Sequence, residues 1–133
     1  FGLSERIAFT AGDILSDDPD TGFDVVWISH LLHSENPANS SVIVDKAVKA
    51  LNPGGLLLIQ EFILHDDKTA PLFPALFSLN MLIGTPSGQA YSQQEIAAIM
   101  AGAGVADIRR LQLDLPNGAG VMVGTAAIKN TEK

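Results

Sequence analysis

The sequence contains no cysteine among its 133 residues. This excludes disulfides and thiolate metal sites, and it fits a reducing compartment, so we predict a cytoplasmic location. Basic residues are also scarce: 8 lysines and arginines face 15 acidic residues, for a formal net charge of −7. Such a chain repels phosphate backbones and anionic lipid, so neither nucleic acid nor a membrane is an expected partner. No apolar run approaches the roughly 18 residues of a membrane span.

Apolar residues are plentiful. They make up 47% of the chain against 17% charged residues, which is enough for one domain of this length to bury a core. We therefore expect a single domain over residues 1–133. The first residue is Phe1 and residues 1–6 read as the end of a helix, so we expect the sequence to be part of a longer protein.

Strand-like and helix-like runs alternate along the chain. Strands are predicted at residues 7–15, 23–29 and 55–64, and the nearly continuous apolar run at 23–29 predicts a central parallel strand covered on both faces. Helices are predicted at residues 40–51, 71–83 and 92–104, the last from its capping-box sequence. Because residues 71–83 are apolar on nearly every side, we expect that helix to be covered all round.

Two final strand-like runs, at residues 105–115 and 121–128, flank a turn sequence at 116–118 and predict an antiparallel hairpin. The pattern as a whole predicts an open α/β sheet that is mostly parallel, with an antiparallel strand at one side.

Polar residues fall at the carboxyl ends of three predicted strands, where ligands bind in open parallel sheets. Asp13 allows two interpretations. It follows Gly12, so the backbone can approach a ligand, and its carboxylate can accept a hydrogen bond from an amine while Ile14 offers an apolar surface to a flat ring. Alternatively, Asp13 caps the backbone amides of a turn.

His30 and His33 lie three residues apart. A metal would need further ligands, for which Glu35 and His65 are the nearest candidates, so we expect no metal site. A histidine at a strand end can instead accept a proton from a hydroxyl if a carboxylate orients its other nitrogen, and Glu61 is the candidate. For either histidine alone, a structural role stays open.

The order and spacing of these segments resemble the carboxyl-terminal portion of class I S-adenosylmethionine-dependent methyltransferases, in particular the small-molecule O-methyltransferases of plants and bacteria. The similar segments are AGDIL, FDVVWISHLLH, ALNPGG, LLLIQEFIL and ALFSLNMLIGTPSGQAYS. The resemblance implies a Rossmann-like sheet that lacks its first two strands, and methyl transfer from S-adenosylmethionine to a hydroxyl of a small-molecule acceptor. The alternative is a non-catalytic α/β module that self-associates through residues 71–83.

The resemblance also implies roles for single residues. The catalytic base falls on His33 and a carboxylate that steadies it on Glu61, which leaves His30 a bystander. The family's substrate-facing methionine falls on Met81, in the helix that lines the acceptor pocket. The neighbouring Asn80, the one polar amide in that helix, is a second acceptor-binding candidate, and alternatively it pairs with backbone. Positions near the cofactor fall on Gly12, Asp13, Ile14 and Ser29.

The chain departs from the family pattern in several places. The family's second histidine-steadying glutamate falls on Ala90, and Ser34-Glu35 replaces a common Asp-Trp pair. The glycine-rich loop and the ribose-binding acid of the family are not in this chain, so we expect an incomplete cofactor site. Lacking neighbouring strands, the sheet should expose unpaired edges, and we expect a homodimer that covers them, with residues 7–15 paired to a partner or displaced.

Overall fold

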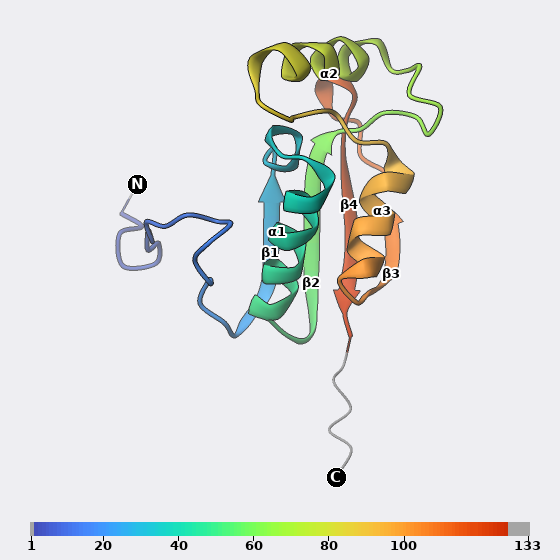
Figure 1. The fold of residues 1–133 in the computed structure, drawn as a ribbon. Coiled ribbons are helices and arrows are strands. Elements are labelled where there is room, and N and C mark those ends of the chain that lie inside the picture. The colour runs from blue at the N-terminus through green and yellow to red at the C-terminus, as the bar shows by residue number, and fades with distance from the viewer. Residues whose placement is uncertain (1, 128–133) are drawn as a thin grey trace.

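The computed structural model describes residues 2–127, and the predicted end of the last strand at residue 128 lies outside them. Helices and strands alternate as expected for the α/β class (Figure 1). The elements are β1 (Phe23–Ser29), the 3-10 turn η1 (Leu32–Ser34), α1 (Pro37–Ala50), β2 (Leu51–Phe62), α2 (Leu72–Gly84), α3 (Gln93–Gly102), β3 (Val105–Arg110), the 3-10 turn η2 (Pro116–Gly118) and β4 (Ala119–Ala126).

The described sheet has the strand order β1-β2-β4-β3. β1 and β2 are parallel and joined through α1, whereas β4 runs antiparallel to both β2 and β3. The sheet is therefore mixed, not mostly parallel. The predicted antiparallel pairing of the last two strands is confirmed, and the chain reverses at η2, where Asn117 has a φ of 59°.

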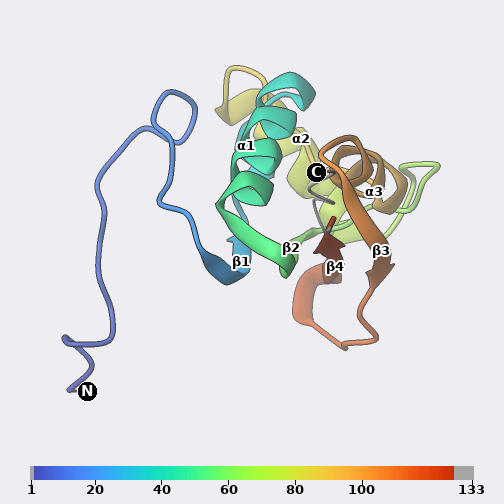
Figure 2. The ribbon, with the colours of Figure 1, turned by 90° about the horizontal axis from the view of Figure 1, so that it is seen from below.

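Helices α1 and α3 lie side by side over one face of the sheet (Figures 1 and 2). Each starts at a capping residue: Asn36 accepts a hydrogen bond from the Asn39 amide, and Ser92 and Glu95 form the predicted capping box. Their buried side chains close the core over the sheet. The core includes Ile43, Val44, Leu57, Ile59, Ile96, Met100 and Met122.

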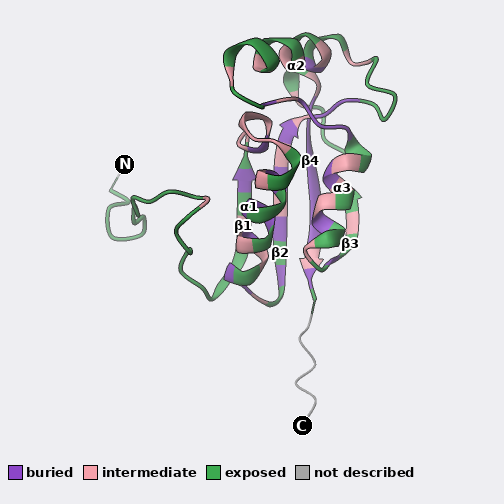
Figure 3. Ribbon diagram, in the orientation of Figure 1, coloured by how far each residue is buried: buried purple, intermediate pink, exposed green. Residues whose placement is uncertain are grey.

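Two predictions of coverage are wrong for the described chain. β1 is an edge strand with one open face, and Trp27 is 60% exposed. α2 lies across the end of the sheet and exposes most of its apolar side chains, Ile83 to 87% (Figures 1 and 3). An apolar pattern in the sequence predicts that a surface will be covered, but it does not say which element covers it. Within residues 2–127, no element packs on these surfaces.

The amino-terminal segment does not form the predicted strand at residues 7–15. It has no regular secondary structure and does not join the sheet (Figure 2). Phe9 is 95% exposed. A strand needs a neighbour for its backbone groups, and β1 does not pair with this segment. The expected helix end at residues 1–6 is, in its described part, a turn closed on the Leu3 carbonyl. No helix among the described residues is long and apolar enough to cross a membrane.

Candidate active site

The parallel pairing of β1 and β2 brings two polar strand ends together. Ser29, the last residue of β1, pairs with Gln60 of β2, and the next amide, that of His30, donates to the Gln60 carbonyl at 2.8 Å. His30 then turns the chain with a φ of 51°, and η1 follows, anchored by the fully buried Leu32. This turn places His33 over Glu61.

His33 and Glu61 form a close pair. The Nδ1 atom of His33 lies 2.8 Å from Oε2 of Glu61, and the His33 backbone amide donates to Oε1 at 3.4 Å. Glu61 is only 1% exposed, so its carboxylate depends on such partners. An ionised carboxylate only accepts hydrogen bonds, which puts the proton of His33 on Nδ1 and leaves the lone pair of Nε2 free to accept a proton.

His30 is not set apart from this pair. Its Nδ1 lies 3.8 Å from the same Glu61 oxygen. One ligand atom from each of His30, His33 and Glu61 lies within 4.8 Å of the others, a set of donors that suits a divalent transition metal. Sequence reasoning looked for further ligands in Glu35 and His65, so it missed this grouping.

Three phenylalanine rings cluster beside the two histidines. The ring of Phe77, on α2, meets the His33 ring edge-on with centroids 4.8 Å apart, and Phe62 lies 4.6 Å from the ring of His30. Phe73 completes the cluster against Phe62 at 5.0 Å. The sequence predicted only that the helix at residues 71–83 would be covered on all sides, not that it would contact the histidines. Phe73 and Phe77 lie one helical turn apart, and this spacing could have indicated that both rings face the same side of the helix.

The predicted acceptor-binding residues lie further along α2. Asn80 is exposed, and Met81 is half-buried with its carbonyl accepting a hydrogen bond from the Thr85 hydroxyl at 2.7 Å. Asn80 and Met81 thus lie on the same helix as Phe77, the residue of α2 whose ring contacts the His33 ring.

The loop after α2 holds the backbone of His33. The Gln89 amide donates to the His33 carbonyl at 2.9 Å, and a Cβ added to Gly88 would lie 2.4 Å from that carbonyl oxygen. Tyr91 then donates to the Glu35 carbonyl at 2.6 Å and contacts the Ser40 hydroxyl at 3.0 Å. Burial raises the pKa of the Tyr91 hydroxyl above its usual value.

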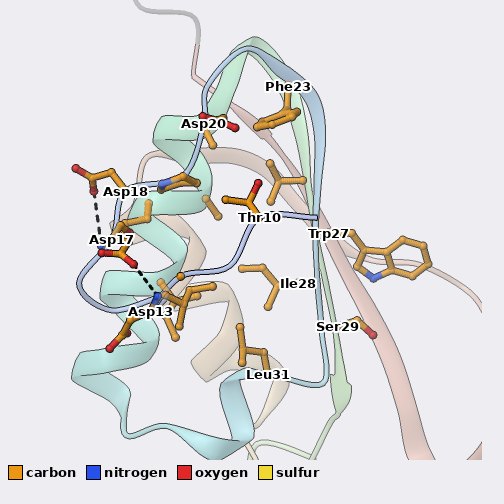
Figure 4. Close-up of a pocket in the computed structure, with 18 of the residues that line it drawn as sticks. Thr10, Asp13, Asp17, Asp18, Asp20, Phe23, Trp27, Ile28, Ser29 and Leu31 are labelled. Carbon is orange, nitrogen blue, oxygen red and sulfur yellow. Dashed lines mark hydrogen bonds and ion pairs between the residues drawn. The ribbon is translucent and has the colours of Figure 1, made fainter. Parts of the chain in front are cut away.

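A cavity of about 710 Å³ lies between the amino-terminal segment and β1 and α1 (Figure 4). The four predicted cofactor residues Gly12, Asp13, Ile14 and Ser29 all line it, and so does His30. Its volume is in the range of small-molecule sites. Figure 4 shows Ile28 directed toward the amino-terminal segment, whereas Trp27 and Ser29 point to the other side of β1, as strand alternation requires.

Asp13 acts in this structure as a turn cap. Its Oδ1 accepts from the Leu15 amide at 2.8 Å, and its own amide donates to Oδ2 of Asp17 at 2.8 Å. This is the second of the two interpretations that the sequence left open. The cap uses Oδ1, so the adenine contact remains a prediction.

Residues 1–106 match the family model described as the O-methyltransferase domain. The chain belongs to the O-methyltransferase family. It is 34% identical over 126 residues to 3-hydroxy-5-methyl-1-naphthoate 3-O-methyltransferase of Streptomyces sahachiroi, a match that covers 95% of this chain and 36% of that protein.

Solved O-methyltransferase structures share the fold. PigF with SAH, a protein known from Serratia, is 32% identical with a TM-score of 0.83, and the match covers 93% of this chain and 36% of that one. Human N-acetylserotonin methyltransferase in complex with SAM is 25% identical with a TM-score of 0.83, covering 96% of this chain and 36% of that one. The chain thus spans about a third of the length of the O-methyltransferases that it matches.

Proposed function

We propose that the protein carrying this chain transfers a methyl group from S-adenosylmethionine to a hydroxyl of a small-molecule acceptor, with His33 as general base. The observation that carries the proposal is the 2.8 Å contact between His33 Nδ1 and Glu61 Oε2. A buried carboxylate that fixes the tautomer of an imidazole leaves its other nitrogen ready to take a proton. Membership of the O-methyltransferase family supports the reaction type.

The chain's own residues account for the proton. When bound, S-adenosylmethionine would supply an activated methyl group on a positively charged sulfur. As the acceptor oxygen takes up that methyl group, Nε2 of His33 would accept the hydroxyl proton. Glu61 stays ionised and stabilises the resulting imidazolium, and solvent later takes the proton. Phe77 packs edge-on against the His33 ring and would limit the access of water to it.

The cavity supports a cofactor site. It combines apolar side chains such as Ile14 and Ile28 with the carboxylates of Asp13, Asp17 and Asp20, which suits a ligand that has a flat ring and cationic groups. We propose that Asp13 and Ile14, beside Gly12, contact the adenine and that Ser29 lies near the methionine end. Asn80 and Met81 on α2 are proposed to face the acceptor.

The direct test is methyl transfer by the whole protein that carries this chain. Wild-type protein incubated with S-adenosylmethionine and a panel of phenols should form S-adenosylhomocysteine and a methyl ether in equal amounts, and His33→Ala should form almost none. Methylation at carbon or nitrogen, or equal activity of the two proteins, would contradict hydroxyl transfer with His33 as the base.

A second candidate is a non-catalytic interaction module. The exposed apolar side chains of α2, such as Leu82 and Ile83, favour it. A module of this kind would bind partners without consuming S-adenosylmethionine, so the same assay separates the two functions.

We also propose that the protein is a cytoplasmic homodimer. Phe23, Val25 and Trp27 of the edge strand β1 are exposed apolar residues that a symmetric contact would cover. Light scattering should give twice the monomer mass, and a stable monomer at high concentration would refute the dimer.

A further inference from the structure

His30 contacts both the cofactor cavity and the His33–Glu61 pair. His30 is one of the residues that line the cavity, and its ring packs on Phe62 and places Nδ1 3.8 Å from Oε2 of Glu61. That Nδ1 is a buried nitrogen for which the structure gives no hydrogen-bond partner among the described residues. A buried polar atom without a partner is costly, so its surroundings call for an explanation.

The other ring nitrogen of His30 has a partner. Its Nε2 lies 3.3 Å from the side-chain amide nitrogen of Gln60. An amide nitrogen only donates hydrogen bonds, so this contact requires a lone pair on Nε2 of His30. A neutral imidazole carries one proton, which must then sit on Nδ1, the atom that faces Glu61.

We infer that His30 is a positioning residue for the proposed base: Gln60 fixes its tautomer, and its Nδ1–H is directed at Oε2 of Glu61, the oxygen that His33 also contacts. A small rotation of the His30 ring would close the 3.8 Å separation to a hydrogen bond. Oε2 of Glu61 would then accept from two imidazole N–H donors, His30 and His33, which restrain the carboxylate against rotation. The inference rests on the proposed function of His33.

The backbone of His30 sets the choice of variants. Its φ of 51° lies in the left-handed region, which asparagine and glycine tolerate best. His30→Asn keeps a short side chain with an N–H donor, whereas His30→Gly relieves the same backbone without supplying a donor. Comparison of the two variants therefore separates the effect of losing the N–H donor from the effect of the backbone geometry.

The kinetic test uses the whole protein that carries this chain. We expect His30→Gly to lower kcat roughly 10-fold and His30→Asn to recover most of that loss, with the Kd for S-adenosylmethionine within about twofold of wild type in both. If His30→Gly weakens cofactor binding while kcat is unchanged, His30 is a cofactor contact and the inference is wrong. It is equally wrong if both variants lose kcat alike, or if a chelator abolishes activity and Zn²⁺ restores it.

A second measurement needs no catalysis. Nitrogen NMR of the imidazoles at neutral pH should show His30 protonated at Nδ1 and bare at Nε2, and Gln60→Leu should abolish this tautomer preference while the His33 signals keep theirs. A proton on Nε2 of wild-type His30 would overturn the inference. Should wild-type protein methylate no acceptor, the proposed function fails, but the NMR result still decides the tautomer of His30.

Discussion

His33 and Glu61 are 28 residues apart in the chain, yet a ring nitrogen of the first lies 2.8 Å from a carboxylate oxygen of the second. The contact spans two neighbouring parallel strands and joins a half-buried imidazole to a buried acid. Such a pair can take up a proton and hold the resulting charge away from bulk water. The predictions begin with its two members.

Replacing His33 by alanine removes the proposed proton acceptor. We expect kcat to fall by roughly 10² to 10⁴ and the Kd for S-adenosylmethionine to stay nearly constant, since the base acts on the acceptor. Steady-state kinetics and calorimetry measure the two quantities. His30→Gly, which suits the left-handed backbone at that position, is the comparison variant and should cost only about 10-fold. Equal losses in the two variants would remove His33 from the role of base.

Glu61→Gln keeps the shape of the side chain but removes its charge. His33 can still donate to the amide oxygen, but the imidazolium that forms during transfer loses its counter-charge, so kcat should fall by roughly 10- to 10³-fold. Cofactor affinity should hold. If Glu61→Gln kept the wild-type kcat, the role of Glu61 would be structural and not catalytic.

Asp13 can be tested for its two roles with a matched pair. Asp13→Asn keeps an Oδ1 acceptor for the Leu15 amide, whereas Asp13→Ala removes it. If a carboxylate contact to the cofactor amine is lost, Asp13→Ala should weaken cofactor binding by about 1 to 3 kcal/mol, and Asp13→Asn should weaken it too. Titration calorimetry of the whole protein measures both. Unchanged affinity in Asp13→Asn would leave Asp13 as a turn cap alone.

Gly88 tests the support of His33 by the loop behind it. An alanine methyl there would overlap the His33 carbonyl and the Thr85 hydroxyl, each 2.4 Å from the added carbon. We expect Gly88→Ala to lower the free energy of unfolding by about 1 to 3 kcal/mol and to lower kcat. Gly84→Ala is the control, because its added carbon meets nothing within 4 Å. Equal unfolding midpoints for the two variants would contradict this packing.

Tyr91 gives a prediction about alkaline pH. Because burial raises the pKa of its hydroxyl above the unfolded value of about 10, the folded state holds the proton more tightly. Its contribution to stability is therefore complete below pH 10 and is lost as the pH rises through the folded pKa. Tyr91→Phe should cost about 1 kcal/mol at pH 7, from the hydrogen bond to Glu35, and should flatten the alkaline decline seen in denaturant unfolding. An unaltered decline would exclude Tyr91 as its source.

The sequence predicted strands at residues 23–29 and 55–64, and Glu61 as the carboxylate for a histidine near the end of the first. That prediction was possible because continuous apolar runs indicate parallel strands, and ligands bind at the carboxyl ends of such strands. The choice of His33 over His30 rested on the family resemblance. The capping box at Ser92 depends only on residues close together in the chain, so it too could be predicted from the sequence. These features depend on residues near one another in the chain or on one rule of sheet geometry.

Other features depend on contacts between residues far apart in the chain, and the sequence did not predict them. Residues 7–15 have the composition of a strand, but no strand of the described chain pairs with them, and composition does not say which neighbour a strand requires. The approach of His30 to Glu61 depends on a left-handed backbone angle at a residue other than glycine, which no periodicity reveals. Phe77 reaches His33 only because α2 crosses the end of the sheet (Figure 1).

The pairing of Ser29 with Gln60 has a consequence for the order of folding. A parallel pair needs a crossover connection, here the segment that contains α1, so the two halves of the site meet only once that connection has brought β2 beside β1. A slip by one residue would also turn Glu61 to the opposite face. The ring signals of His33 should therefore be among the last to reach their native positions during refolding, which makes this histidine a reporter for completed assembly of the sheet.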